Sequence, residues 1–280
     1  MTRTDTPALL LRVAPPVGRR LGRRLVGTGG ARYLIERNIR VYRQGWAVLV
    51  SGIFEPVFYL LSVGVGVAQL VGRVELPGGQ LVTYTAFIAP AMLASSAMNG
   101  AMYDAVFNLF FKLKYNKLYD AVLATPITPV DVAAGEITWA LMRGAFYSSA
   151  FLLVMLVMGL ITSWWALLAL PAVVLVGFSF AALGTAATTY MKSWQDFEYV
   201  TLVTLPMFLF SATFYPLSTY PESLQWVVRL SPLYHAATLL RELTTGSVSA
   251  SSLVHVVVLV AIGLVGVLVT GRRLERLLLT

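Results

Sequence analysis

Residues 137–190 read ITWALMRGAFYSSAFLLVMLVMGLITSWWALLALPAVVLVGFSFAALGTAATTY, and Arg143 is the one charged residue among them. A bilayer core of about 30 Å requires about 20 predominantly apolar residues in a helix. The stretch is long enough for two such helices, at 137–161 and 164–190, with two residues between them. We therefore predict a tight helical hairpin that crosses a membrane twice.

The composition of the whole chain agrees with this hairpin. Of 280 residues, 58% are hydrophobic and 12% are charged, about half of the ~25% typical of soluble domains. The mean hydropathy is +0.75. The chain has no cysteine, which excludes disulfides, thiolate nucleophiles, iron–sulfur clusters and Cys-based zinc sites. Two histidines, His235 and His255, are too few for a histidine metal cage.

Four further stretches have the length and apolar content of a span, or nearly so. Glu55 and Pro56 interrupt the first, Pro90 interrupts the second, and the third is short. A helical bundle tolerates such prolines because neighbouring helices satisfy the backbone groups that they free. With the hairpin, these stretches predict an all-α integral membrane protein with six spans, at residues 46–70, 83–104, 137–161, 164–190, 197–215 and 253–271.

Lys and Arg are unevenly distributed, and their excess marks the cytoplasmic side of a membrane protein. The chain has 21 Lys and Arg against 13 Asp and Glu, a net charge of +8. With a cytoplasmic N-terminus, that side holds 17 of the 21, the other side holds three, and Arg143 lies inside a span. We therefore predict two cytoplasmic termini. Residues 1–30 form a basic, disordered tail that meets anionic lipid rather than nucleic acid, and residues 31–280 form a single transmembrane domain.

Residues 32–46 fit a helix that lies on the membrane surface. Four large apolar residues recur at spacings of 4, 3 and 4, which places them on one helical face: Ile35, Ile39, Tyr42 and Trp46. Five charged residues occupy other positions of the helix: Arg32, Glu36, Arg37, Arg40 and Arg43. Such an N-terminal amphipathic helix lies in the interface with its apolar face toward lipid.

Residues 216–245, on the external side between the fifth and sixth spans, are neither a span nor an ordinary loop. The segment is rich in Leu and also holds Trp226, Val227 and Val228, yet Pro221 and the pair Ser231 and Pro232 break it. Proline removes a backbone donor and disfavours helix at the preceding residue. We predict short re-entrant helices that cap the bundle, because irregular backbone at membrane depth must be shielded by protein.

Four passages occur in a distinctive order: EPVFYL at 55–60, FIAPA at 87–91, YDAVLATP at 119–126 followed by GEI at 135–137, and LSPLYH at 230–235. In order and spacing they resemble the type-2 ABC exporter permeases, within them the branch that exports nodulation factors (lipo-oligosaccharides) and daunorubicin-type drugs. The likeness covers about residues 33–275. One departure is Ala91, where the family often has glycine.

This resemblance implies a complex of two permease subunits and two separate ATPase subunits in the bacterial plasma membrane. The second permease is either another copy of this chain or a similar chain. The sequence contains no G-x-x-x-x-G-K-[ST], the loop that cradles nucleotide phosphates. We therefore expect no cofactor on this chain, which is not itself an enzyme, and ATP with Mg²⁺ on the ATPase partner.

The resemblance implies export of an amphipathic substrate (a drug, a lipid or a lipid-linked oligosaccharide) from the cytoplasm or the inner leaflet. The path is expected between the first, second and fifth spans of the two permeases. The candidate path residues on these spans are Glu55, Tyr59, Met92, Ser96, Phe208 and Phe210.

Two intramembrane charges need a physical explanation. Glu55 lies about 13 Å into the first span at ~1.5 Å per residue, where a carboxylate is costly. It is either a hydrogen-bonded carboxyl that locks helix packing or a residue of the substrate path. Arg143 lies about 9 Å from the cytoplasmic edge, and we favour a guanidinium that snorkels to the interface. The alternative is an ion pair with Glu55 or Asp104.

The internal loop at 112–131 resembles the coupling helix that sits in a groove of the ATPase in this family. We expect the amphipathic surface helix to share that contact. The candidate coupling residues are Arg37, Arg40, Tyr115, Tyr119, Asp120, Leu123 and Pro126.

Two other functions remain as alternatives. An ion-coupled secondary transporter using Glu55 predicts an inverted repeat between the two halves of the chain, and none is visible. A membrane enzyme acting on lipid-linked sugars needs clustered carboxylates or histidines at one interface. The external side offers Glu75, Glu222 and Glu242, which are widely spaced.

Overall fold

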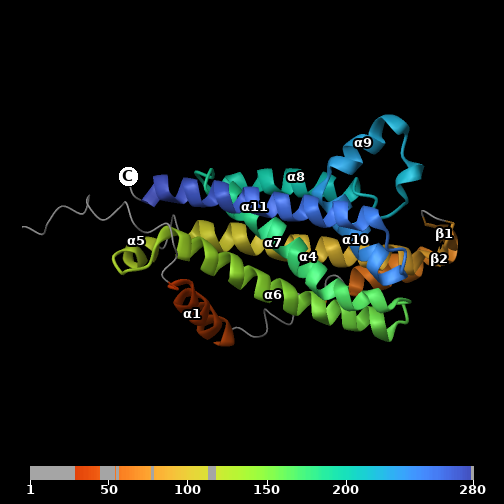
Figure 1. The fold of residues 1–280 in the computed structure, drawn as a ribbon, viewed down its shortest axis with the longest axis horizontal. Coiled ribbons are helices and arrows are strands. Elements are labelled where there is room, and N and C mark those ends of the chain that lie inside the picture. Colours follow the sequence, from red (N-terminus) through yellow and green to blue (C-terminus); the bar gives the residue numbers. More distant parts are fainter. Residues whose placement is uncertain (1–28, 45–53, 55–56, 77–78, 113–117, 279–280) are drawn as a thin grey trace, which may run out of the picture.

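Helices run along the long axis of the molecule in Figure 1, a computed structural model that describes residues 29–44, 54, 57–76, 79–112 and 118–278. The helices in this direction are α4 (Tyr84–Phe110), α6 (Pro129–Val157), α7 (Ala169–Thr188), α8 (Phe197–Leu209) and α11 (Ala250–Leu278).

The two ends of the bundle carry different elements (Figure 1). We call the end with α1 (Ala31–Gln44), α5 (Leu118–Leu123) and the C-terminal end of α11 the inner end. The outer end holds α9 (Glu222–Leu230), α10 (Pro232–Thr245) and an antiparallel hairpin of β1 (Arg73–Glu75) and β2 (Leu81–Thr83). In this hairpin Val74 pairs with Val82.

Helix α4 is the centre of the bundle and packs against α6, α7 and α10. Several of its large side chains, such as Phe87 and Leu93, are fully buried among many alanines. Glycines let the neighbouring backbones approach. A Cβ on Gly184 of α7 would lie 3.1 Å from the Met102 carbonyl oxygen of α4, and one on Gly266 of α11 would lie 2.7 Å from the backbone of α7. Helices α4, α7 and α11 therefore form a tightly packed series.

Within the described part of the chain, three helices are long and apolar enough to cross a membrane: Val130–Val157, Trp164–Thr188 and Ala250–Arg276. They coincide with the predicted spans at 137–161, 164–190 and 253–271. The predicted hairpin forms, since α6 packs against α7. Its turn is wider than two residues because α6 ends at Val157, and Gly159 adopts a φ of 69° that only glycine accepts readily.

The other predicted spans have different shapes. Helix α4 covers the stretch at 83–104 and continues to Phe110. A shorter apolar helix at Val57–Val71 covers part of the stretch at 46–70. It includes a π-helical turn, η2 (Leu60–Val65), and the short helix α3 (Ala68–Val71).

The prediction of a fifth span that is helical to residue 215 is wrong. Helix α8 ends at Leu209, so its 13 residues extend about 20 Å at ~1.5 Å per residue. Beyond it the chain is irregular, and Ala212 has a φ of 52°. The Leu209 carbonyl accepts from the Tyr220 hydroxyl at 3.3 Å. The backbone after α8 is therefore satisfied by groups from later elements instead of by a further helical turn.

The helix starts follow from short polar sequences. The Thr83 hydroxyl caps α4 by accepting from the Ala86 N–H. Thr128 and Asp131 form a reciprocal capping box at α6. Ser193 and Asp196 form another at the 3₁₀ turn η5 (Trp194–Asp196), just before α8. Backbone N–H groups of residues 192 and 193 donate to Asp196 and hold its pKa below the usual value.

The predicted surface helix matches α1, and its buried side faces α6. Leu34 and Asn38 are buried, and a Cβ on Gly135 of α6 would lie 3.0 Å from the Leu34 side chain. Ile39 is 45% exposed, so the predicted apolar face is not the one that packs on the protein. The predicted tail at 1–30 lies outside the described residues except for Gly29 and Gly30.

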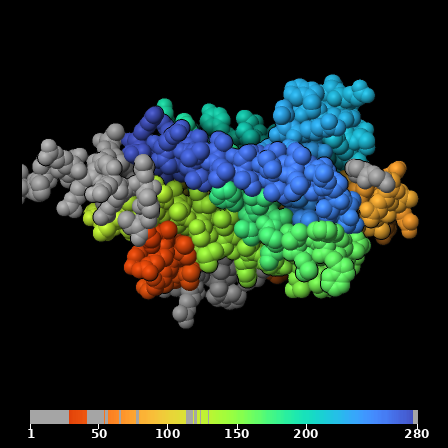
Figure 2. Space-filling model, viewed as in Figure 1, coloured from red at the N-terminus to blue at the C-terminus, as the bar shows by residue number. Residues whose placement is uncertain are grey.

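The predicted external segment forms two helices that break at Ser231, with Pro232 in the first turn of α10. Helix α9 lies in a lobe that stands off the bundle (Figure 2), whereas α10 packs against α4 and α11. The Thr162 N–H donates to the Thr244 carbonyl at 3.1 Å, and the Gln80 amide donates to the Thr245 carbonyl at 3.3 Å. Helix α10 thus joins distant parts of the chain at the outer end.

Candidate functional site

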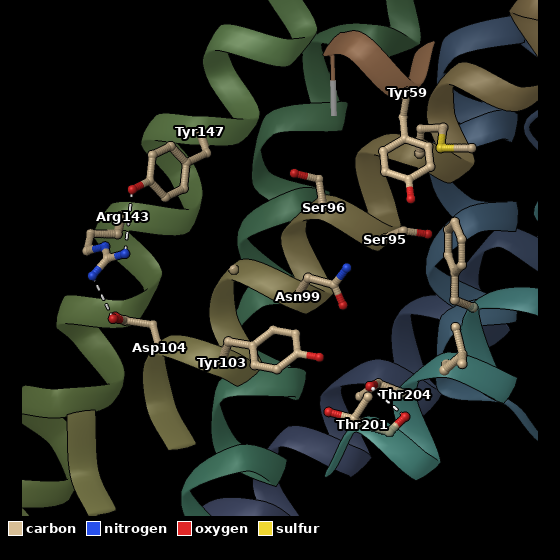
Figure 3. Close-up of a pocket in the computed structure, with 14 residues that line it drawn as sticks. Tyr59, Ser95, Ser96, Asn99, Tyr103, Asp104, Arg143, Tyr147, Thr201 and Thr204 are labelled. Carbon is tan, nitrogen blue, oxygen red and sulfur yellow. Dashed lines mark hydrogen bonds and ion pairs between the residues drawn. The ribbon is translucent and has the colours of Figure 1, made fainter. Parts of the chain in front are cut away.

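A cavity of about 440 Å³ lies between α4, α6, α8 and Tyr59 (Figure 3). Its polar lining residues are Tyr59, Ser95, Ser96, Asn99, Tyr103, Asp104, Arg143, Tyr147, Thr201 and Thr204. Met92, Gly100, Leu205 and Phe208 complete the lining. We call this cavity the central pocket.

The spacing of residues on two helices places them in this pocket. On α4, Met92, Ser96, Asn99 and Tyr103 follow one another at intervals of four, three and four, which keeps them on one face. On α8, Thr201, Thr204 and Phe208 follow the same rule. The two faces look toward each other across the cavity in Figure 3.

The chemistry of the lining is mixed. Its hydroxyl and amide groups, such as those of Asn99 and Thr201, can both donate and accept hydrogen bonds. Met92 and Phe208 supply apolar surface. The charged lining residues, Asp104 and Arg143, balance each other. The pocket can therefore hold a ligand with both polar and apolar parts and does not require a net charge on it.

Asp104 and Arg143 form an ion pair at one wall of the pocket (Figure 3). The Arg143 Nη1 donates to the Asp104 Oδ1 at 2.6 Å, and the side chains are 16% and 6% exposed. Asn108, one turn along α4, also donates to Asp104, and the Tyr147 hydroxyl lies 3.5 Å from Arg143. The interpretation that Arg143 snorkels to the interface is wrong, because a carboxylate on the neighbouring helix holds it.

The structure brings four of the predicted path residues together and leaves one outside. Tyr59, Met92, Ser96 and Phe208 all line the central pocket. Phe210 does not; it lies just past the end of α8 with 49% of its surface exposed. Glu55 lies outside the described residues, so its two interpretations stay open.

Several lining residues were missed from the sequence, including Asn99, Tyr103 and Thr201. Their signal is a stripe of polar residues at helical spacing within an apolar helix. Ser96 and Gly100, four residues apart, resemble a helix-packing pair. In the structure both face the pocket, and the buried pair Ala97 and Ala101 takes the packing role.

A second polar cluster lies at the inner end. The Lys112 Nζ donates to the Glu136 Oε2 at 2.6 Å and to the Asn38 Oδ1 at 3.3 Å, which joins α1, α6 and the residues after α4. An apolar cluster joins the same elements and includes Leu34 and Val132, against which Val122 of α5 packs. Helices α1 and α5 are thus fixed to the inner ends of α4 and α6.

The predicted coupling residues lie on or beside these two helices. Arg37 and Arg40 are exposed on α1, and Arg40 pairs with Glu36 one turn away. Tyr119, Asp120 and Leu123 belong to α5, and Pro126 is exposed in the turn that follows it. Tyr115 lies outside the described residues.

Polar and charged side chains that face the interior of an apolar helical bundle mark a site of function, and a substrate path is one such site. Residues 31–245 match the family model described as ABC-2 type transporter. The chain belongs to this family, which confirms the prediction of a transmembrane permease subunit of the ABC exporter type. Membership implies a transport role and ATPase partners.

Curated relatives agree with this assignment. The chain is 32% identical over 256 residues to Nodulation protein J of Rhizobium leguminosarum bv. viciae, covering 90% of this chain and 96% of the relative. It is 35% identical over 202 residues to Nodulation protein J of R. leguminosarum bv. trifolii, covering 71% and 75%. It is 24% identical over 203 residues to the inner membrane transport permease YadH of Escherichia coli, covering 72% and 75%.

Proposed function

We propose that this chain exports an amphipathic substrate through the central pocket, out of the cytoplasm or the inner leaflet. The observation that carries the proposal is the lining, in which hydroxyl and amide groups of α4 and α8 face each other beside Met92 and Phe208. The described lining carries no net charge, which suits a lipid-linked saccharide better than a cationic drug, since saccharides bind through hydroxyl groups. The Nodulation protein J relatives are consistent with such a substrate.

The proposed topology has six spans, with both termini in the cytoplasm of a bacterium and the chain in its plasma membrane. To the three long apolar helices it adds α4, the segment that contains Val57–Val71, and α8 with the irregular residues that follow it. Helices α9 and α10 then cap the external side as re-entrant helices. The excess of Lys and Arg at the inner end supports this orientation.

A second permease subunit completes the path in this proposal. The outward side of α8 exposes Tyr199, Leu202 and Val203, and Tyr59 at the pocket rim is half exposed. A polar pocket that opened sideways into lipid would leave hydroxyl groups in hydrocarbon, which is costly. A second copy, or a similar chain, that covers α8 and Tyr59 would close this side.

ATP hydrolysis is assigned to a separate ATPase subunit, which would bind the nucleotide and Mg²⁺. Helices α1 and α5 would receive its movement, because buried groups fix both helices to the inner ends of α4 and α6. Rigid-body tilting of these helices would then open the pocket in turn toward the inner side and the outer side.

Filling the pocket tests the transport path. Ser96→Leu places a branched side chain in a cavity of about 440 Å³, and we expect transport by the reconstituted complex to fall about tenfold or more, equivalent to ~1.4 kcal/mol. Basal ATP hydrolysis should persist, because Ser96 lies far from the inner end. Ser149→Leu makes the same change at an exposed position of α6 and should transport normally. Normal transport by Ser96→Leu would refute the assignment of this pocket.

A charge on α5 tests the ATPase contact. We expect Tyr119→Glu with Leu123→Glu to abolish substrate-stimulated ATP hydrolysis or to dissociate the ATPase, while the permease stays folded in the membrane. Leu224→Glu, on the exposed surface of α9, is the matched control and should keep the stimulation. If the α5 variant kept full stimulation and bound its ATPase normally, α5 would not be the coupling helix.

A further inference from the structure

Helix α8 is the most loosely packed wall of the central pocket. Val200 and Thr204 are its buried residues, while Tyr199, Leu202 and Leu205 are all more than half exposed. Its position beside the pocket therefore depends on how its two ends are held. The inner end is held by aromatic rings, since the Phe197 ring stacks on Phe107 of α4 with their centroids 4.2 Å apart.

The outer end is held by a buried arginine of α10. The Arg241 Nε donates to the Phe87 carbonyl of α4 at 3.0 Å, and its Nη2 donates to the Ala212 carbonyl, just past α8, at 3.0 Å. The guanidinium carbon lies 3.9 Å from the centroid of the Phe87 ring. One side chain thus ties the first turn of α4 to the irregular backbone that follows α8.

Arg241 is 7% exposed, and its described hydrogen bonds go to carbonyls rather than to a carboxylate. Burial lowers its pKa to about 10, so it still carries its charge at pH 7. Hydrogen bonds from a charged donor are stronger than neutral ones, and the planar guanidinium can serve two acceptors at once. Both features suit a residue that bridges two backbone segments.

A second, weaker tie acts beside the first. The Ser211 and Ser231 hydroxyls lie 2.5 Å apart, which joins the end of α8 to the start of α10. The Ser231 hydroxyl does not cap α10, so its loss would leave the helix start unchanged. Ala212 between these contacts has a φ of 52°, a conformation that an alanine adopts only when its surroundings impose it.

We propose that Arg241 is a positioning residue that holds the outer end of α8 against α4 and so keeps the central pocket closed toward the outer side. Release of this contact during the transport cycle would let α8 swing about its inner end and open the pocket outward. The proposal rests on the use of the central pocket as the transport path. The distance measurement that tests it uses no substrate. Its result therefore stays informative even if the proposed substrate is wrong.

Spin labels across the outer end test the proposal, because the native chain has no cysteine. Leu81→Cys on β2 and Phe210→Cys past α8 are both exposed sites. The labelled permease, diluted with unlabelled chains, is assembled with its ATPase in lipid nanodiscs. In the parent protein the distance should lengthen only when ATP is trapped. In Arg241→Gln it should lengthen by about 5 Å, roughly one helical turn, without nucleotide.

Coupling provides the second measurement. ATP hydrolysis by the Arg241→Gln complex should persist but lose its stimulation by substrate. Arg241→Lys keeps the charge but lacks the planar fork, so it should restore part of the closed distance. Arg229→Gln, an exposed arginine of α9, is the matched control and should behave like the parent. Ser231→Ala should shift the distance in the same direction by a smaller amount.

Two outcomes would overturn the proposal. The first is an Arg241→Gln complex that keeps the parent distance and full substrate stimulation. The second has two parts: neither Arg241→Gln nor Arg241→Lys assembles into the complex, and Ser231→Ala keeps the distance of the parent protein. Arg241 would then only stabilise the fold.

Discussion

Asp104→Asn is expected to destabilise the protein by about 3–5 kcal/mol, the usual cost of breaking a buried ion pair by removing one partner. The change removes the carboxylate that lies 2.6 Å from the Arg143 guanidinium. Arg143 would then keep its charge inside the bundle without the carboxylate that it bonds at 2.6 Å, while the Tyr147 hydroxyl stays beside it at 3.5 Å. Thermal unfolding of the purified permease, followed by tryptophan fluorescence, measures the effect.

Replacing both partners separates stability from function. Asp104→Leu with Arg143→Met removes both charges, and such changes are often neutral or stabilising. We expect the double variant to unfold near the parent temperature but to transport poorly, because the pair forms one wall of the central pocket. Glu198→Gln, an exposed carboxylate on α8, is the control and should change neither property. A stable Asp104→Asn variant would show that the pair contributes little.

Gly266→Ala is the second change with a large expected effect. A Cβ at this position would lie 2.7 Å from the Ala182 carbonyl carbon and 2.9 Å from its oxygen. These are backbone atoms of α7, so the rotation of a side chain cannot relieve the contact. Helix α11 must move away as a unit. Overpacking of this kind costs about 1–3 kcal/mol.

Gly271→Ala is a control on the same helix with the opposite expected sign. A Cβ there meets nothing within 4 Å, and alanine is favoured over glycine in a helix by about 1 kcal/mol. The two variants should therefore unfold below and above the parent temperature, respectively. Equal unfolding temperatures for both would mean that the close approach of α7 and α11 does not limit stability.

Periodicity and hydropathy predicted the parts of the fold that depend on neighbouring residues in the chain. The hairpin at 137–190 and the break before Pro232 are of this kind, since a run of apolar residues and a proline act locally. The irregular backbone after α8 could not be predicted in this way. Its carbonyl at Ala212 is satisfied by Arg241, which lies 29 positions further along the chain.

The candidate site shows the same division. The resemblance directed attention to Tyr59, Met92, Ser96 and Phe208, which do meet at the pocket. The estimated distance of Arg143 from the cytoplasmic edge of its span favoured snorkelling. Such an estimate considers one helix and leaves out the side chains of the adjacent helix. Asp104 decides the outcome from α4, 39 positions earlier in the chain.

The outer end of this protein is completed by residues that lie late in the chain. Phe87 leaves the ribosome 154 residues before Arg241, the side chain that bonds its carbonyl, and Gln80 leaves 165 residues before its acceptor on Thr245. Chains emerge from the N-terminus, so α4, α6 and α7 reach the bilayer before α10 is made. A ribosome that stops before residue 241 therefore leaves inserted helices whose outer backbone lacks its partners. Chains that lack α10 should therefore be cleaved more readily at the outer end than chains that contain it.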